Sequence, residues 1–265
     1  MTRGNKVLIA AIGLLIIVMA VMYFVMPLLG FSYSVIMSSS LQHDNDQSQL
    51  GVLDTGDIAM TVGPDSVEIQ SYVKGTTTGY RSFGDYGSII TYERGSNENP
   101  VIHRAIVWLT YNGNGTWSST ELADYQGDWY CPGCTYHNLQ GILTFTDITQ
   151  SHKRVEINLD SLGRQSGFLT MGDNPVTNPN FDQSGLISHP VSMSEIKSVA
   201  MYEIPWLGVV KVYMTPEKKQ YLEHVPNSIY SMIMLYSMIA ILIYCCDVFH
   251  IYDDTKKKRR ELETL

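Results

Sequence analysis

The chain has 265 residues, a formal net charge of -8 and 45% hydrophobic residues. Its mean hydropathy of -0.03 would suit a soluble protein, but this average hides two runs without a charged side chain, residues 7–29 and 226–246. A helix needs about 20 apolar residues to cross the core of a bilayer, and both runs are that long. A protein free in the cytosol is therefore excluded.

Basic residues flank the two runs on their outer sides. Arg3 and Lys6 precede the first run, and residues 256–260 are all Lys or Arg. Because short segments rich in Lys and Arg stay in the cytoplasm, we expect a cell-membrane protein with two spans and both termini inside. The expected divisions are a cytoplasmic start with a transmembrane anchor (1–29), an extracytoplasmic domain (30–226), a second transmembrane helix (227–246) and a basic cytoplasmic tail (247–265).

Each run has an alternative interpretation. The first could be a cleaved signal peptide, but such a segment has an apolar part of about 7 to 15 residues and ends at small residues, whereas Tyr23, Phe24, Met26 and Pro27 stand here. The second could be a buried core helix, although the basic tail favours a span. Residues 30–226 hold 11 Lys and Arg against 21 Asp and Glu. We expect no nucleic-acid partner, because that would need a basic face.

Between the runs, apolar residues occur in short bursts that are rich in β-branched and aromatic types and bounded by Gly, Asn, Asp or Pro, as is typical of strands. The expected strands are residues 58–62, 88–92, 102–111, 142–145, 155–159 and 208–214. Residues 110–164 are less regular and indicate loops with hairpins. The predicted fold class is therefore mainly β.

A few polar residues could carry chemistry. Ser38, Ser39 and Ser40 follow the first run by about ten residues, a distance that keeps their hydroxyls near the membrane surface. A serine becomes a nucleophile only when a base removes its proton, and His103, inside an apolar strand-like run, is the best candidate. Taken one at a time, these residues have plain structural interpretations: a polar segment leaving the bilayer and a hydrogen-bonded core histidine.

The order of several short pieces is more specific than any one of them. After the serines come Gly56-Asp57-Ile58, Gly84-Asp85, Val101-Ile102-His103-Arg104, Met171-Gly172-Asp173-Asn174 and Ile204-Pro205-Trp206-Leu207-Gly208. This series resembles type I signal peptidases, specifically the archaeal and endoplasmic-reticulum branch that uses Ser and His. The resemblance covers roughly residues 7–214. It implies a signal-peptidase-like β domain outside the membrane, flanked by N-terminal and C-terminal transmembrane helices.

The resemblance also implies residue roles. Ser40 matches the nucleophile and His103 the general base, while both Asp173 and Asp182 match the acidic partner; we favour Asp182 for orienting the histidine and Asp173 for supporting the site. The implied function is a membrane-bound serine endopeptidase, without cofactor or metal, that cleaves signal peptides from exported preproteins after small residues. Its implied partners are preproteins and the lipid bilayer, with the translocation machinery as a further candidate.

Three positions depart from the family pattern. Leu41 replaces a usual Met, His43 a usual Pro, and Met171 a usual Lys, so the pattern leaves His103 as the base. The stretch 104–172 is also longer than the resemblance implies, and we expect it to contain an inserted subdomain of unassigned role.

Cys131 and Cys134 form a Cys-Pro-Gly-Cys sequence within that insertion. A disulfide is the leading interpretation, because disulfides persist outside the cell; half of a zinc site with His137 and a redox-active pair are the alternatives. Composition and topology also fit a different kind of protein, a non-catalytic membrane-anchored surface receptor or assembly domain. The ordered Ser40, His103 and aspartate set favours the peptidase.

Overall fold

The computed structural model describes residue 13, residues 24–95 and residues 98–263. Most of the first apolar run falls outside them, so the predicted N-terminal span lies outside the described residues; the end of that run holds α2 (Met26–Leu28). Gly30–Ser228 forms one compact unit, and the C-terminal helix is described separately below.

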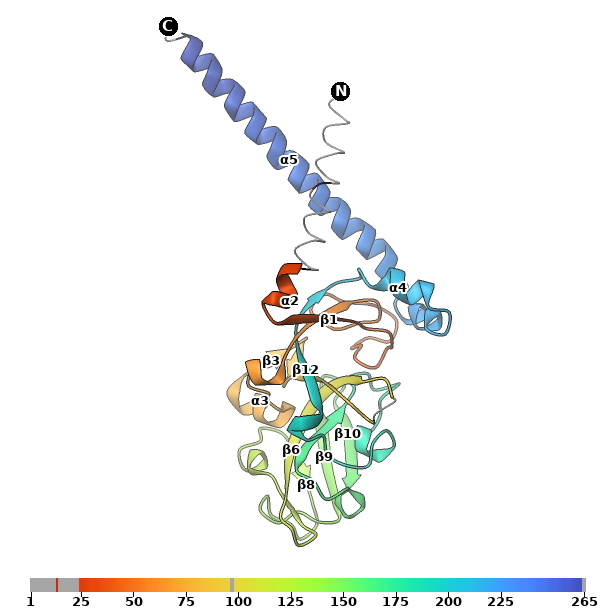
Figure 1. Ribbon diagram of the computed structural model, residues 1–265. Helices are drawn as coiled ribbons and strands as arrows, with labels where there is room; N and C mark the ends of the chain where they lie inside the picture. Colours follow the sequence, from red (N-terminus) through yellow and green to blue (C-terminus); the bar gives the residue numbers. More distant parts are fainter. Residues whose placement is uncertain (1–12, 14–23, 96–97, 264–265) are drawn as a thin grey trace. The chain divides into compact units, whose positions relative to one another are not determined.

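The compact unit is mainly β, as the sequence predicts, and its strand pairs are antiparallel. The main sheet has the order β1-β2-β12-β5-β6-β11, with β7 paired to β6 (Figure 1). Its strands are β1 (Phe31–Val35), β2 (Ile58–Val62), β5 (Ile89–Tyr92), β6 (Val101–Tyr111), β7 (Trp117–Ser118), β11 (Gly167–Met171) and β12 (Ile196–Ile204). A two-stranded sheet pairs β3 (Arg81–Ser82) with β4 (Asp85–Tyr86).

Short helices connect these strands. They are α3 (Tyr72–Thr78), α4 (Val209–Met214) and the 3-10 turns η2 (Pro64–Ser66), η3 (Thr120–Ala123), η4 (Leu159–Ser161), η5 (Asp182–Ser184), η6 (Met193–Glu195) and η7 (Lys219–His224). Ser71 caps the start of α3, since its side chain accepts a hydrogen bond from the Lys74 N–H at 2.9 Å.

Strand β6 has buried side chains on both faces because hydrophobic clusters cover both faces of the main sheet here. Successive side chains of a strand point to opposite faces: Ala105 packs with Tyr92 and Phe168 in one hydrophobic cluster, and Ile106 packs with Leu169 in another. The preceding pair, His103 and Arg104, therefore also faces opposite sides of the sheet.

The long stretch between β6 and β11 holds a second, three-stranded sheet of order β10-β9-β8. Its strands are β8 (Trp129–Tyr130), β9 (Ile142–Ile148) and β10 (Lys153–Asn158). Leu143, Phe145, Val155 and Ile157 are at most 4% exposed and join the larger hydrophobic cluster. The predicted strands 142–145 and 155–159 thus form one hairpin of this sheet, drawn in green in Figure 1.

One predicted strand is wrong. Residues 208–214 form the short helix α4 and not a strand. Its buried residues, Val209 and Val212, are three positions apart, while Val210, Tyr213 and Met214 are exposed. This is the spacing of a helix face, and the β-branched composition of the segment concealed it.

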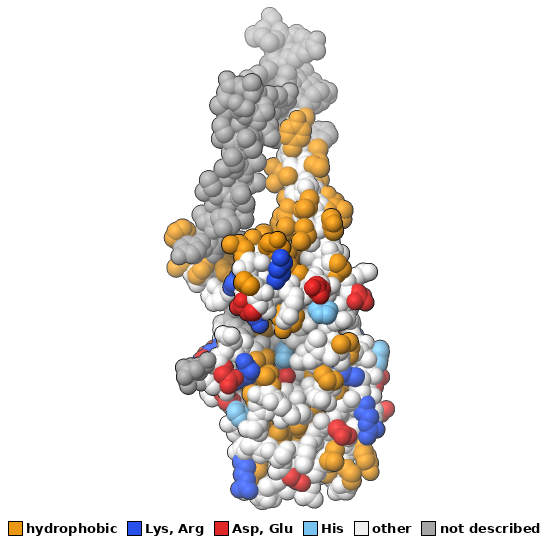
Figure 2. Space-filling model, turned by 90° about the vertical axis from the view of Figure 1, so that its right-hand side faces the viewer, with side chains coloured by type: hydrophobic (Ala, Val, Ile, Leu, Met, Phe, Trp, Pro, Cys, Tyr) orange, Lys and Arg blue, Asp and Glu red, His pale blue; other side chains and the backbone are white. Residues whose placement is uncertain are grey.

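The C-terminal helix α5 (Ser228–Glu263) carries the second apolar run. Its part Ser228–Cys246 has a mean hydropathy of 2.1 and is long and apolar enough to cross a membrane. Figure 2 shows apolar side chains gathered along this part of α5. Membrane association is therefore supported for the C-terminal run, and the helix continues through most of the basic tail.

Two buried carboxyl groups lie where the main sheet meets α4. Asp57 accepts hydrogen bonds from the N–H groups of Trp206 and Asp54, each at 2.7 Å. Burial raises the pKa of Asp57 to about 8 and that of Asp54 to about 7, and the nearby Glu203 adds to both shifts. Among the described residues, one oxygen of Asp54 has no hydrogen-bond partner.

These shifts predict that stability falls as the pH rises. The folded state holds the two protons more tightly than the unfolded chain, in which Asp titrates near pH 4. Their contribution is therefore fully present below about pH 4 and is lost as the pH rises through 7 and 8. Asp54→Asn should flatten this slope and raise stability at pH 9 by about 1–2 kcal/mol. Thermal unfolding of the wild type and of Asp54→Asn from pH 5 to 9 measures how the stability of each depends on pH.

The exposed Asp65 provides the matched control. Asp65→Asn makes the same chemical change at the surface and should leave the pH slope as it is in the wild type. A slope that Asp54→Asn leaves unchanged would contradict the assigned cause.

Candidate active site

His103 forms a buried pair with Asp182. Its Nδ1 atom lies 2.9 Å from both carboxylate oxygens of Asp182, and the two side chains are 6% and 2% exposed. The Tyr92 hydroxyl donates a further hydrogen bond to Asp182 at 2.7 Å. Burial works against the carboxylate, but the histidine and these donors outweigh it and lower the pKa of Asp182.

The neighbouring Arg104 holds the other candidate aspartate. Its Nε and Nη2 atoms donate to the two oxygens of Asp173 at 2.8 and 2.6 Å, and both side chains are almost completely buried. Burial alone would raise the pKa of Asp173, but the guanidinium outweighs it and holds that pKa well below its usual range. The two aspartates therefore have different principal partners: Asp182 pairs with His103, and Asp173 pairs with Arg104.

The segment after β11 fixes the backbone of the serines. Asn174 donates its backbone N–H to the Ser40 carbonyl at 3.0 Å and its side-chain Nδ2–H to the Ser39 carbonyl at 2.8 Å. A Cβ atom at Gly172 would collide with the same Ser40 carbonyl oxygen. Only glycine permits this close approach. Gly172 and Asn174 together therefore fix the position of the Ser40 backbone carbonyl.

The Ser40 hydroxyl is partly exposed between two buried neighbours, Ser39 and Leu41. It shares a hydrogen bond of 3.2 Å with the Ser38 hydroxyl, and within the described residues no hydrogen bond joins it to His103. The structure therefore pairs His103 with Asp182. Ser40 is separate from this pair, and its backbone is hydrogen-bonded to the loop that begins at Gly172. In unliganded enzymes the catalytic hydrogen bonds are often long and form only with substrate.

His43 is a second histidine of the site, which motif matching treats only as a departure. Its Nε2 atom lies 3.3 Å from Asp173, and its side chain is 6% exposed. It follows Ser40 by three residues, a proximity that could have marked it as an alternative base. The distance from His43 to Asp173 is longer than the 2.9 Å from His103 to Asp182, and Asp173 also accepts two hydrogen bonds from Arg104.

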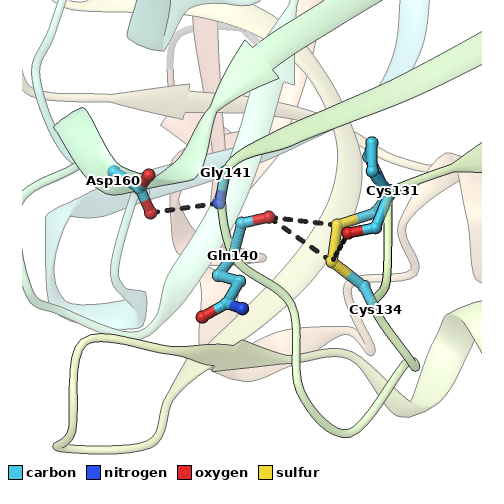
Figure 3. Close-up of a disulfide and its surroundings, with 6 residues drawn as sticks. Cys131, Cys134, Gln140, Gly141 and Asp160 are labelled. Carbon is cyan, nitrogen blue, oxygen red and sulfur yellow. Dashed lines mark hydrogen bonds between the residues drawn. A yellow bond between two sulfur atoms is a disulfide. The ribbon is translucent and has the colours of Figure 1, made fainter.

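The Cys-Pro-Gly-Cys sequence carries a disulfide. Cys131 and Cys134 are joined with a Cα–Cα distance of 5.3 Å, and the Gln140 carbonyl oxygen lies 3.1 and 3.4 Å from their sulfur atoms (Figure 3). The adjacent Gly141 N–H donates to Asp160 at 3.0 Å. A disulfide leaves neither thiolate for zinc, and the described residues contain no group of three or more His, Cys, Asp or Glu that could hold a metal ion.

The different partners of the two aspartates predict different effects on stability. Asp173→Asn leaves the buried Arg104 without its counter-charge, which typically costs about 3–5 kcal/mol. Asp182→Asn should cost less, because a neutral imidazole needs no counter-charge. Thermal unfolding of the two variants, followed by circular dichroism, measures the difference. A melting temperature that is lower for Asp182→Asn than for Asp173→Asn would contradict the prediction that Asp173 is the more important for stability.

The site thus combines a buried imidazole–carboxylate pair with a partly exposed serine whose backbone is fixed. The chain matches no protein-family model, no curated protein and no solved structure. What the site can do is argued below from these residues and their geometry.

Proposed function

We propose that the protein is a membrane-bound serine endopeptidase that cleaves signal peptides from exported preproteins, with Ser40 as nucleophile and His103 as general base. The observation that carries the proposal is the His103–Asp182 pair on a sheet whose next strand, β11, leads into the loop that holds Ser40. A receptor domain has no need for this arrangement.

The pair with Asp182 fixes the state of the imidazole. An ionised carboxylate only accepts hydrogen bonds, so Nδ1 of His103 carries the hydrogen that Asp182 receives at 2.9 Å. In the neutral ring, Nε2 then has its lone pair free to take the hydroxyl proton of Ser40 during attack. The imidazolium formed in this step is stabilised by Asp182 and returns the proton to the leaving amine.

Substrate binding would order the serine. Ser40 exchanges its present partner, the Ser38 hydroxyl, for His103 when a peptide bond is seated. The Ser38 hydroxyl is then free to donate to the oxyanion, together with the Ser40 N–H. One such donor typically contributes about 3 kcal/mol of transition-state stabilisation.

The sheet offers a place for an extended substrate. Strand β1 is one of the two edge strands in the order of the main sheet and ends at Val35, five residues before Ser40. An added strand would form backbone hydrogen bonds without reading the sequence. A signal peptide that spans the same bilayer would present its cleavage segment beside this edge, and shallow pockets would select small residues.

Replacement of the proposed nucleophile or base should abolish cleavage. Ser40→Ala removes the attacking oxygen and His103→Gln removes the base, so each should lower kcat at least 10³-fold, and the double variant should be scarcely worse than either alone. The assay uses the full chain in detergent with a preprotein substrate, and the new N-terminus is sequenced.

His43→Gln is the matched control, because it removes another buried histidine that is paired with an aspartate. It should retain most of the activity. Loss of cleavage in His43→Gln with retention in His103→Gln would transfer the role of base to His43. Processing by Ser40→Ala would end the peptidase proposal and favour the receptor domain.

The proposal includes the two-span topology with both termini in the cytoplasm. Protease added to intact cells should cut the domain that contains residues 110–165 and spare a tag placed after Leu265, because the basic tail at residues 256–260 stays inside. Digestion of the tag from outside would contradict this orientation.

A further inference from the structure

The turn between β9 and β10 has a strained backbone that the proposed function leaves unexplained. Thr149 and His152 adopt φ angles of +61° and +48°. This left-handed region costs a residue other than glycine roughly 1–2 kcal/mol, and Thr149 is in addition β-branched and buried. Such strain persists where surrounding contacts hold the segment, and this turn and the residue after it make two sets of contacts.

One set of contacts reaches the loop that carries Asp85. The backbone N–H of Gln150 donates to Asp85 at 2.8 Å, and its side-chain Nε2–H donates to the Gly84 carbonyl at 2.8 Å. The carbonyl groups of the same loop surround the guanidinium of Arg104, with Tyr86 at 3.0 Å and Gly87 at 2.9 Å. The turn therefore contacts the loop that holds Arg104 in place.

A second set of contacts reaches the loop that holds Ser40. Lys153, the first residue of β10, donates from Nζ to the Asn178 carbonyl at 2.7 Å and to the Gly172 carbonyl at 3.4 Å. Residues 172 and 178 stand at the two ends of this loop, and an Asn174–Asn178 backbone hydrogen bond of 2.9 Å closes it. The lysine thus joins both ends of the loop to the inserted hairpin.

We propose that Lys153 is a positioning residue for Ser40: through it the inserted hairpin holds the 172–178 loop in the conformation that places the serine. This role rests on the proposed peptidase function. It also gives the insertion a task, since the strained turn contacts the Gly84–Gly87 loop and Lys153, which follows the turn, contacts the 172–178 loop.

The charge of Lys153 depends on pH within a useful range. Burial lowers the pKa of Lys153 to about 8, against the attraction of Asp173 and Asp182. Arg104 and His43 bind Asp173, and His103 binds Asp182, so these groups set the local charge together with the adjacent His152 and Arg154. Loss of the proton as the pH rises through 8 weakens the hydrogen bonds that Lys153 donates to the loop.

Hydrogen exchange tests the contact without relying on the reaction. In full-length protein in detergent, Lys153→Met should speed amide exchange in residues 172–178 at least 10-fold and leave β6 unchanged. Arg154→Met is the matched control, because Arg154 is the next residue of β10 and is exposed; it should exchange like the wild type. Equal exchange in Lys153→Met and the wild type would overturn the proposal.

Kinetics test the consequence for the serine. Lys153→Met should lower kcat for preprotein cleavage about 10- to 100-fold, as expected for a small misplacement of a reacting group, with little change in KM. Because Lys153 loses its proton as the pH rises through 8, the kcat of the wild type should fall above that pH. Lys153→Arg should restore most of kcat and move this fall to higher pH, since arginine stays charged. Unchanged kcat in a folded Lys153→Met protein would overturn the positioning role.

The two proposals fail differently. If the wild type does not cleave any preprotein, the proposed function is wrong, and the exchange result alone decides whether the hairpin holds the loop. If Lys153→Met does not fold, the pH dependence of kcat in Lys153→Arg tests the role of Lys153 instead. A profile above pH 8 that is identical to that of the wild type would overturn this role.

Discussion

The buried ion pair between Arg104 and Asp173 is the interaction on which the arrangement of the site depends. A guanidinium with no exposed surface is tolerated only when its hydrogen bonds are satisfied, because the cost of removing it from water is several kcal/mol. Asp173 and the carbonyl groups of Ser82, Tyr86 and Gly87 provide these bonds. Arg104 of β6 therefore holds the Ser82–Gly87 segment and the 172–178 loop at fixed positions. The second of these is hydrogen-bonded to the backbone of Ser40.

The short sequence pieces acquire separate physical meanings in the fold. Gly172 allows the close approach of the Ser40 carbonyl, and Asn174 holds the serine backbone. Gly56 has a φ of +95°, and a Cβ there would collide with Val209, while Asp57 accepts the N–H of Trp206. Pieces that are far apart in the chain thus meet in pairs in the fold.

The sequence predicts the strands well where apolar residues alternate or run unbroken between turn residues, as in 58–62 and 102–111. It fails at α4, because the β-branched residues of this segment favour a strand, and only the burial of Val209 and Val212 on one face identifies a helix. Motif order alone favoured Asp182 over Asp173, and the structure places the Asp182 carboxylate on His103. Long-range contacts such as that of Lys153 with Gly172 could not be predicted, because they depend on how the β9–β10 hairpin packs against the main sheet.

The alternation along β6 has a consequence for how the protein matures. His103 and Arg104 are adjacent but face opposite sides, and a slip of one residue in strand pairing would turn each of them to the other face of the sheet. Depending on the direction of the slip, Ile102 or Arg104 would stand where His103 meets Asp182, so no imidazole would lie beside that carboxylate. The His103–Asp182 pair therefore forms only when β6 is paired with its neighbours in the native register, and its formation marks the completion of that step of folding.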